Sequence, residues 1–173
     1  MFCIVGMPGS GKNEFVEIGR RFGYSVIVMG DAVRDETLRR GLPLEMHGEV
    51  ASSLRKEYGD AAVARLVLPY MRDEKKTIVD GVRGWDEIEE FRKHYDVTIV
   101  GIICSSQKRF ERLKARGREG DPQNWREFER RDWRELGFGL GNVLALADCY
   151  IENEGTLEEF WEACERLFET GKT

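Results

Sequence analysis

A glycine-rich loop near the N-terminus is the feature that most constrains this chain. Residues 6–13 read Gly-Met-Pro-Gly-Ser-Gly-Lys-Asn, which matches the pattern GxxxxGK except that Asn13 stands where Ser or Thr is expected. The loop follows an unbroken apolar run at residues 2–6, typical of a parallel strand, and precedes apolar residues spaced as in a helix over residues 11–22. Such a loop turns backbone N–H groups and the positive end of the helix toward phosphate oxygens, and Lys12 adds a cation. The sequence therefore predicts a site for a nucleoside triphosphate.

The residues of this phosphate loop have separate expected contacts. Mg²⁺ keeps several of its waters when bound, so the Asn13 amide oxygen could reach it directly or through a water. The missing hydroxyl therefore weakens the expectation of a metal ligand more than that of phosphate binding. We expect the donor nucleotide to contact Gly6, Pro8, Gly9, Ser10, Gly11, Lys12, Asn13 and Glu14.

Predicted strands and helices alternate along the whole chain. Further strands are expected at residues 24–29, 76–80, 96–104 and 147–151. Helices are expected at residues 32–41, with Asp31 as a cap, and at 44–58, 60–72, 86–94, 106–116, 124–135 and 156–170, the last capped by Thr156. This order predicts an α/β fold of three layers with a five-stranded parallel sheet, and 173 residues suit one domain, residues 1–173.

Composition restricts the classes of function. There are 27 basic and 32 acidic residues, a net charge of −5, which argues against nucleic-acid binding through a basic field over the whole protein. No apolar stretch approaches the ~20 residues that a membrane span requires, and the N-terminus lacks a secretory signature. The four cysteines lack a CxxC spacing and favour buried, reduced thiols. We expect a cytoplasmic protein with no membrane or nucleic-acid partner and leave its oligomeric state open.

Two segments after the second and third predicted strands resemble adenylate kinases. MGDAVR at residues 29–34 resembles their TGDxxR segment, and VDGVR at residues 79–83 resembles their DGFPR segment, one residue shorter. ADCYIENEGT at residues 147–156 resembles the loop of dephospho-CoA kinases that surrounds the adenine of ATP, which implies adenine contacts from Asn153 and Gly155. The whole chain is similar to an archaeal family described as adenylate-kinase-related or dephospho-CoA-kinase-like. The resemblance implies a P-loop NTPase fold of the nucleotide-kinase type, with ATP and Mg²⁺ as cofactors.

The acceptor side follows from the same segments. Ligands bind beyond the carboxyl ends of parallel strands, and arginine offers a planar fork for a phosphate. A carboxylate at the end of an apolar strand, such as Asp80, is costly unless a cation faces it, which makes it a candidate Mg²⁺ ligand. Alternatively, Asp31 only caps its helix and Arg34 only pairs with a surface carboxylate. The candidate acceptor residues are Asp31, Arg34, Asp80, Gly81 and Arg83, and the resemblance implies an acceptor-binding helical insertion at about residues 31–75.

A basic segment follows the fourth predicted strand. Six of the eleven residues at 108–118 are basic, and Arg112 and Arg116 match the RxxxR that opens the lid of adenylate kinases. The resemblance implies a short lid at about residues 117–135, whose arginines contact the transferring phosphoryl group. We expect Arg112, Arg116 and one of Arg126 or Arg130, with Arg130 preferred; the alternative is a solvated charged face. The lid has no cysteine or histidine cluster, which argues against a zinc-bearing lid.

Three functions remain open. A nucleoside monophosphate acceptor is already ionised and needs no general base, and the arginine after Asp31 favours this reading. A hydroxyl acceptor, as in dephospho-CoA, would need one, with Asp31 as the candidate. A nucleotide-dependent switch or assembly factor would hydrolyse ATP without any acceptor. Residues 137–141, although glycine-rich, are expected to form a turn, and His47 is assigned no chemistry.

Overall fold

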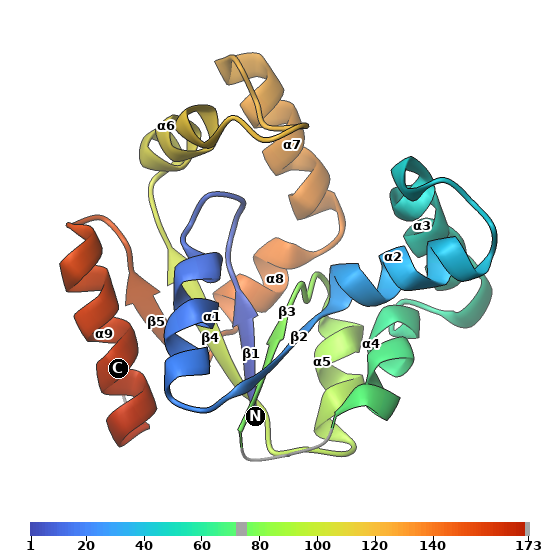
Figure 1. Ribbon diagram of the computed structural model, residues 1–173, viewed down its shortest axis with the longest axis horizontal. Helices are drawn as coiled ribbons and strands as arrows, with labels where there is room; N and C mark the ends of the chain where they lie inside the picture. The colour runs from blue at the N-terminus through green and yellow to red at the C-terminus, as the bar shows by residue number, and fades with distance from the viewer. Residues whose placement is uncertain (72–75, 172–173) are drawn as a thin grey trace.

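Five parallel strands form one sheet in the order β2-β3-β1-β4-β5, so the strand that leads into the phosphate loop lies at the centre (Figure 1). The computed structural model describes residues 1–71 and 76–171. Its strands are β1 (Phe2–Val5), β2 (Ser25–Val28), β3 (Thr77–Asp80), β4 (Thr98–Ile103) and β5 (Cys149–Glu152). Within the sheet, Ile4 is in register with Asp80 on one side and with Val100 on the other. The five-stranded parallel sheet predicted from the sequence is confirmed.

Helices cover both faces of this sheet and extend beyond its carboxyl end (Figure 1). On one face lie α1 (Lys12–Arg21) and α9 (Leu157–Thr170). The other carries α5 (Trp85–Arg92), α8 (Leu140–Ala145) and an outlying group: α2 (Met29–Arg39), α3 (His47–Tyr58) and α4 (Ala62–Val67) with short 3-10 turns at Leu44–Met46 and Leu68–Tyr70. Beyond the strand ends stand α6 (Ser106–Arg116) and α7 (Trp125–Gly137). No helix in the described ranges is long and apolar enough to cross a bilayer.

Each face of the sheet has its own apolar core. Side chains alternate along a strand, so Cys3 and Val5 of β1 join the core under α2–α5 and α8, while Ile4 joins the core under α1 and α9. Cys164 of α9 lies in that second core. Burial raises the pKa of both the Cys3 and Cys164 thiols to about 12. All four cysteines are free, and Cys104 and Cys149 are only partly buried.

The structure differs from the predicted helices in one start, in the division of two helices and in one additional helix. The helix α2 begins at Met29 instead of Ala32, so Asp31 lies inside its first turn and does not cap it. The segment at residues 44–58 is divided into a 3-10 turn and α3, and the next one into α4 and a second 3-10 turn that contains Pro69. The predicted end of that helix at residue 72, and the last part of the insertion at 72–75, lie outside the described residues. The glycine-rich segment at residues 137–141 contains the start of α8, which the sequence did not predict.

Candidate active site

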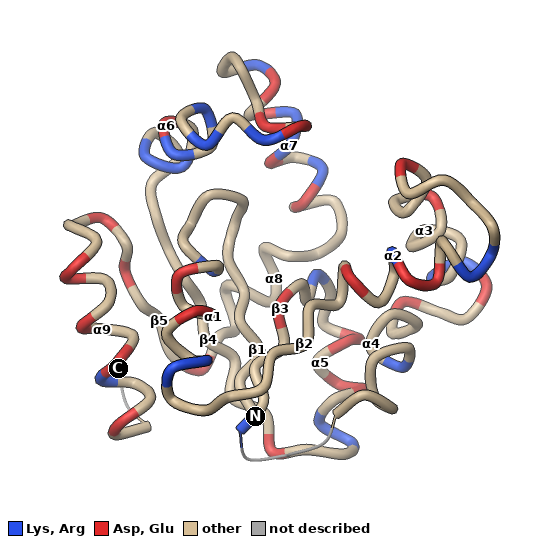
Figure 2. The backbone as a smooth tube through the Cα atoms, in the orientation of Figure 1, with Lys and Arg blue, Asp and Glu red and all other residues tan. Residues whose placement is uncertain are grey.

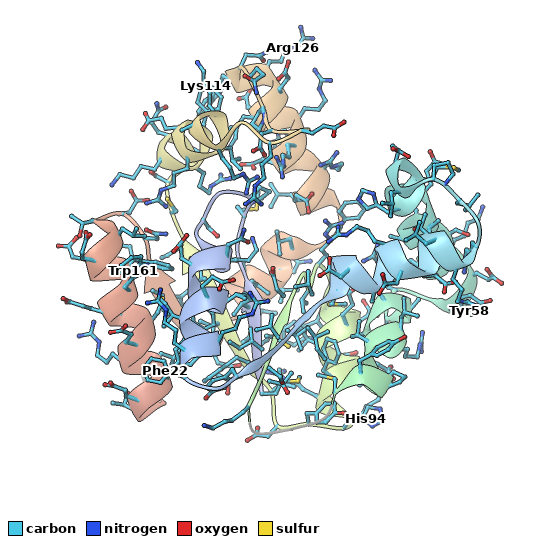
Figure 3. All side chains as sticks on the ribbon, in the orientation of Figure 1. Phe22, Tyr58, His94, Lys114, Arg126 and Trp161 are labelled. Carbon is cyan, nitrogen blue, oxygen red and sulfur yellow. The ribbon has the colours of Figure 1, made fainter. Side chains whose placement is uncertain are left out.

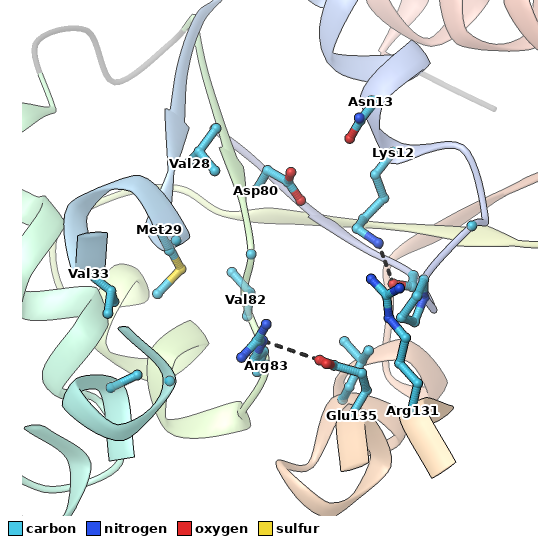
Figure 4. A pocket seen from close by; sticks show the side chains of 18 of the residues that line it. Lys12, Asn13, Val28, Met29, Val33, Asp80, Val82, Arg83, Arg131 and Glu135 are labelled. Carbon is cyan, nitrogen blue, oxygen red and sulfur yellow. Dashed lines mark hydrogen bonds and ion pairs between the residues drawn. The ribbon is translucent and has the colours of Figure 1, made fainter. Parts of the chain in front are cut away.

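A cleft of about 510 Å³ opens at the carboxyl ends of the strands, between the phosphate loop, the α2–α4 group and α7 (Figure 4). It follows that residues from distant parts of the sequence meet in one cavity. Of the predicted residues, thirteen line it: Gly6, Pro8, Gly9, Gly11, Lys12, Asn13, Glu14, Arg34, Asp80, Gly81, Arg83, Arg112 and Arg116. Ser10, Asp31, Arg130, Asn153 and Gly155 are not among the lining residues.

The phosphate loop requires glycine at two positions, Gly9 and the Gly11 of the GxxxxGK pattern. Gly9 has φ of 84° and Gly11 has φ of 114°, both in the left-handed region. A Cβ atom at Gly9 would also lie 2.8 Å from the backbone oxygen of Arg109. Gly11 is the N-cap of α1, and no side chain accepts from the first turn there. The loop therefore leaves helix N–H groups free of side-chain caps beside the cleft, which fits the phosphate chain of a nucleotide.

The side chain of Lys12 folds back against the phosphate loop. Its Nζ donates a hydrogen bond of 2.6 Å to the carbonyl oxygen of Gly6 (Figure 4). Burial lowers the pKa of the Lys12 ammonium, and the carboxylate of Asp80 acts in the opposite direction. A partly buried cation held by backbone oxygens is suited to exchange that contact for an anionic ligand.

Asp80 ends β3 and turns toward the same space as Lys12 (Figure 4). Its Oδ1 atom is buried and has no hydrogen-bond partner among the described residues. Burial raises the pKa of Asp80, while Lys12 and the backbone N–H of Gly81 lower it. An unpartnered carboxylate oxygen in this position fits Mg²⁺, which is commonly held by one or two carboxylates, waters and substrate phosphates. Asn13 is exposed in the first turn of α1 and also lines the cleft.

The two predicted acceptor arginines have different partners. Arg34 of α2 pairs with Asp31, which is exposed and outside the cleft. Arg83, in the loop after β3, lies with Nε 3.3 Å from Oε2 of Glu135 on α7. Its guanidinium is also 5.3 Å from the ring centre of Phe138. The loop after β3 is therefore connected to α7 through the Arg83–Glu135 ion pair.

A buried carboxylate organises the predicted lid. Asp121, whose side chain is 2% exposed, accepts bonds of 2.6 and 2.8 Å from Arg116 and one of 2.9 Å from Arg131. The backbone N–H of Arg118 donates to the same carboxylate at 3.1 Å. The hydrogen bonds from Arg116, with those from Arg131, hold the pKa of Asp121 well below its usual range. The carboxylate of Asp121 therefore links the lid loop to α6 and α7.

Arg131, not Arg130, lies in the cleft. Arg130 is exposed and lines a separate hollow between the lid loop and α7. The helical spacing explains the difference: Phe128 is buried, and Arg131 and Glu135 follow it by three and seven residues, on the same face of α7. Arg131 and Glu135 extend into the cleft in Figure 4. The inward apolar residue of α7 was the signal that could have identified both.

Arg112 is connected to the phosphate loop through Asn153. Its Nη2 donates to the backbone oxygen of Asn153 at 3.1 Å and to the Asn153 side-chain oxygen at 3.0 Å. The buried Asn153 amide in turn donates to the carbonyl oxygen of Ser10 at 2.8 Å. Asn153 therefore connects the loop after β5 to the phosphate loop, while Gly155 is exposed two residues further on.

Basic residues gather around the cleft. Figure 2 shows lysines and arginines concentrated on α6 and α7, above the strand ends. In Figure 3, Lys114 and Arg126 mark the outer end of these two helices, opposite Phe22 near the base of the sheet. The cleft is also lined by Arg55, Arg118 and His47, which the sequence did not single out. Anionic ligands are therefore favoured at this end of the molecule.

Comparison with known proteins gives relatives and fold neighbours. The AAA domain family matches residues 5–129. A UPF0200 protein of Thermococcus sibiricus is 49% identical over 178 residues, covering 98% of this chain and 94% of the relative. One from Methanopyrus kandleri is 50% identical over 172 residues, covering 95% and 86%. The solved structure of TT1252 from Thermus thermophilus has a TM-score of 0.66 at 20% identity, covering 99% of this chain and 97% of that one. Shikimate kinase from Bacteroides thetaiotaomicron has a TM-score of 0.61 at 15% identity, covering 97% and 96%.

Proposed function

The chain belongs to the UPF0200 family and contains an AAA domain with the P-loop kinase fold, and from this premise we propose that it is a nucleotide kinase. It transfers the γ-phosphoryl group of ATP to a nucleoside monophosphate. Residues 1–173 form one kinase domain in this proposal, with the α2–α4 group as the acceptor-binding part and residues 117–135 as the lid.

One observation carries the proposal: the phosphate loop and two acceptor-side arginines line the same cleft. Lys12, Asp80, Arg34 and Arg83 all line it. In this proposal Lys12 and Asp80 serve the donor, and Arg34 and Arg83 serve the acceptor. Phosphoryl transfer needs little covalent chemistry from the protein, but it needs the two substrates close together and in line. A cleft with cations on both sides supports this arrangement.

Each side of the cleft has a distinct task. The phosphate loop and Lys12 bind the phosphates of ATP, and Asp80 and Asn13 would hold Mg²⁺, which neutralises charge on those phosphates. Arg34, Gly81 and Arg83 bind the acceptor. Arg112, Arg116 and Arg131 stabilise the negative charge that spreads over the transferring phosphoryl group. Arg131 takes the role that the sequence predicted for Arg130.

The position of Asp31 supports a phosphate acceptor over a hydroxyl acceptor. A hydroxyl must lose a proton as the new bond forms, so its general base must reach the acceptor. Asp31 is exposed, outside the cleft, and engaged by Arg34. A monophosphate needs no such base and can be oriented by Arg34 itself.

The test is a panel of nucleoside monophosphates, dephospho-CoA and no acceptor, each incubated with ATP and Mg²⁺. Products are identified directly by mass spectrometry, so phosphorylated acceptor and ADP are measured together. We expect one class of monophosphate to raise ADP formation strongly and to yield equimolar diphosphate. ADP formation that is indifferent to every acceptor would favour the switch, and phosphorylated dephospho-CoA would favour hydroxyl transfer.

A further inference from the structure

Arg55 of α3 is a cleft-lining arginine with unused hydrogen-bonding capacity. Its side chain is 16% exposed, and its Nη2 donates to Oε1 of Glu87 at 3.0 Å. Its Nη1 is buried and has no hydrogen-bond partner among the described residues. A buried charged donor without an acceptor is unfavourable, and an oxyanion in the cleft would satisfy it.

Arg55 is fixed in place beside Arg83. Glu87, whose side chain is 1% exposed, accepts from Arg55 through Oε1 and from the backbone N–H of Arg83 through Oε2, at 2.8 Å. Both guanidinium groups also lie over the ring of Phe138, at 5.8 and 5.3 Å from its centre. One carboxylate and one aromatic ring therefore position two arginines as a pair, which reduces the conformational freedom that ligand binding must remove.

The surroundings of the pair limit what it can recognise. The nearby cleft wall is apolar, with Val33, Ala51, Val63, Val82 and Leu140. Among the described lining residues of α2, α3, α4, α8 and the loop after β3, none carries an amide or a hydroxyl side chain. Besides the arginines, the lining residues of these elements include the His47 imidazole as a hydrogen-bonding side chain. Recognition at this end therefore depends on charge and shape more than on neutral hydrogen-bonding groups.

We propose that Arg55 binds the acceptor and forms, with Arg83, an anion site at the far end of the cleft. The inference rests on the proposed kinase function and deepens it: the site takes an oxyanion carried on a compact apolar or ring-shaped body, which in the proposed acceptor is the monophosphate group, and a preference for a carboxylate would contradict that acceptor. Glu87 is a positioning residue in this arrangement. The free N–H groups of Arg55 bind the oxyanion, and the apolar wall packs against the body.

The experiment measures anion binding by titration calorimetry, with the donor side first filled by Mg²⁺ and a non-hydrolysable ATP analogue. The probes are phenyl phosphate, benzoate and neutral benzyl alcohol. We expect Arg55→Met to weaken binding of the preferred anion by about tenfold or more, since a charge-assisted hydrogen bond is lost. Arg65→Met, which removes an arginine of α4 that does not line the cleft, should leave it unchanged. The preferred anion distinguishes a phosphate from a carboxylate.

The outcomes separate this inference from the kinase assignment. If the wild-type protein fails to bind the ATP analogue, the proposed function fails. If it binds the analogue but neither anion, or if Arg55→Met binds the anion as tightly as wild type, Arg55 has no acceptor role. If Arg55→Met folds poorly, Arg55→Lys serves instead, because it keeps the positive charge and removes the planar guanidinium group. Arg55→Lys should bind the anion several-fold more weakly than wild type. An unchanged affinity would also overturn the inference.

Discussion

The side-chain amide of Asn153 donates a 2.8 Å hydrogen bond to the carbonyl oxygen of Ser10, joining positions 143 residues apart in the chain. Both groups are buried. The contact fixes the phosphate loop from outside, and the same asparagine also accepts from Arg112. Order in the phosphate loop therefore depends on a residue in the loop after β5.

Replacing Asn153 with alanine tests this dependence. The Ser10 carbonyl and the Arg112 guanidinium would each lose a partner, so we expect a loss of about 1–3 kcal/mol in the free energy of unfolding and weaker ATP binding. Urea unfolding and calorimetry measure the two effects. The exposed Asn142 of α8 provides a control, because Asn142→Ala should change neither. An Asn153→Ala protein with wild-type ATP affinity would contradict this account of the loop.

Lys12→Ala should fold normally and lose activity. Lys12 is the preorganised cation of the phosphate loop, and removing one such group typically costs about 10²–10³ in rate. Desolvation lowers the pKa of this ammonium, so its removal relieves an unfavourable term and the free energy of unfolding should stay close to that of wild type. Turnover is compared with Lys56→Ala, an exposed lysine of α3. Near-normal turnover in Lys12→Ala would refute the assignment of this loop to phosphoryl transfer.

Arg34→Ala and Arg83→Ala should affect the acceptor rather than ATP. Each change is expected to raise the acceptor KM and lower kcat/KM, with ATP affinity within a few fold of wild type. Arg39→Ala on the exposed side of α2 is the matched control. If both variants weaken ATP binding as much as acceptor binding, the donor and acceptor sides have been exchanged in our proposal.

Asp31→Asn should be a mild substitution. Asp31 and Arg34 form an ion pair in which both side chains are more than 40% exposed, and such pairs contribute about 0–1 kcal/mol. We expect a modest loss of activity through the orientation of Arg34. A fall of about 10²–10⁴ in kcat with an unchanged acceptor KM would instead identify Asp31 as a general base and favour a hydroxyl acceptor.

The stability supplied by Asp121 should depend on pH. Because its pKa is depressed in the folded protein, its contribution is complete above the pKa of an unfolded carboxyl and is lost as the pH falls toward the folded pKa. Asp121→Asn should therefore lower the free energy of unfolding by about 1–3 kcal/mol at pH 7 and by progressively less below about pH 4. Urea unfolding at pH 7, 5 and 3 measures the difference, with the exposed Asp35→Asn as control. If the stability difference between wild type and Asp121→Asn grows on acidification, the predicted direction of the pH dependence is wrong.

The sheet and most helices were predictable because their signals are local. An unbroken apolar run identified β1, and short segments rich in β-branched and apolar residues identified the other four strands. Thr156 caps α9, as predicted, and does so in a capping box with Glu159. The start of α2 was misjudged because Asp31, a common cap residue, follows two residues that are already helical. The short α8 was missed because its six residues, which follow Gly139 and include Gly141, carry little periodicity.

The residues of the candidate site also differ in how far local sequence signals locate them. The phosphate loop and the residues at strand ends could be located because they follow directly from the strands. Arg131 was missed although the buried Phe128, three residues earlier on α7, indicates its face of the helix. Arg55 could not be located, because its selection depends on how α3 is rotated against the rest of the chain. The roles given to the site residues stay predictions until the variants above are measured.

The two buried thiols give this protein a separate reporter for each layer of its core. Cys3 lies under α2–α5 and α8, and Cys164 under α1 and α9. A thiol that is inaccessible and has a pKa near 12 reacts with an alkylating reagent only when its surroundings open. Their individual modification rates, resolved by mass spectrometry, therefore distinguish loosening of the layer that carries the acceptor helices from loosening of the layer behind the phosphate loop.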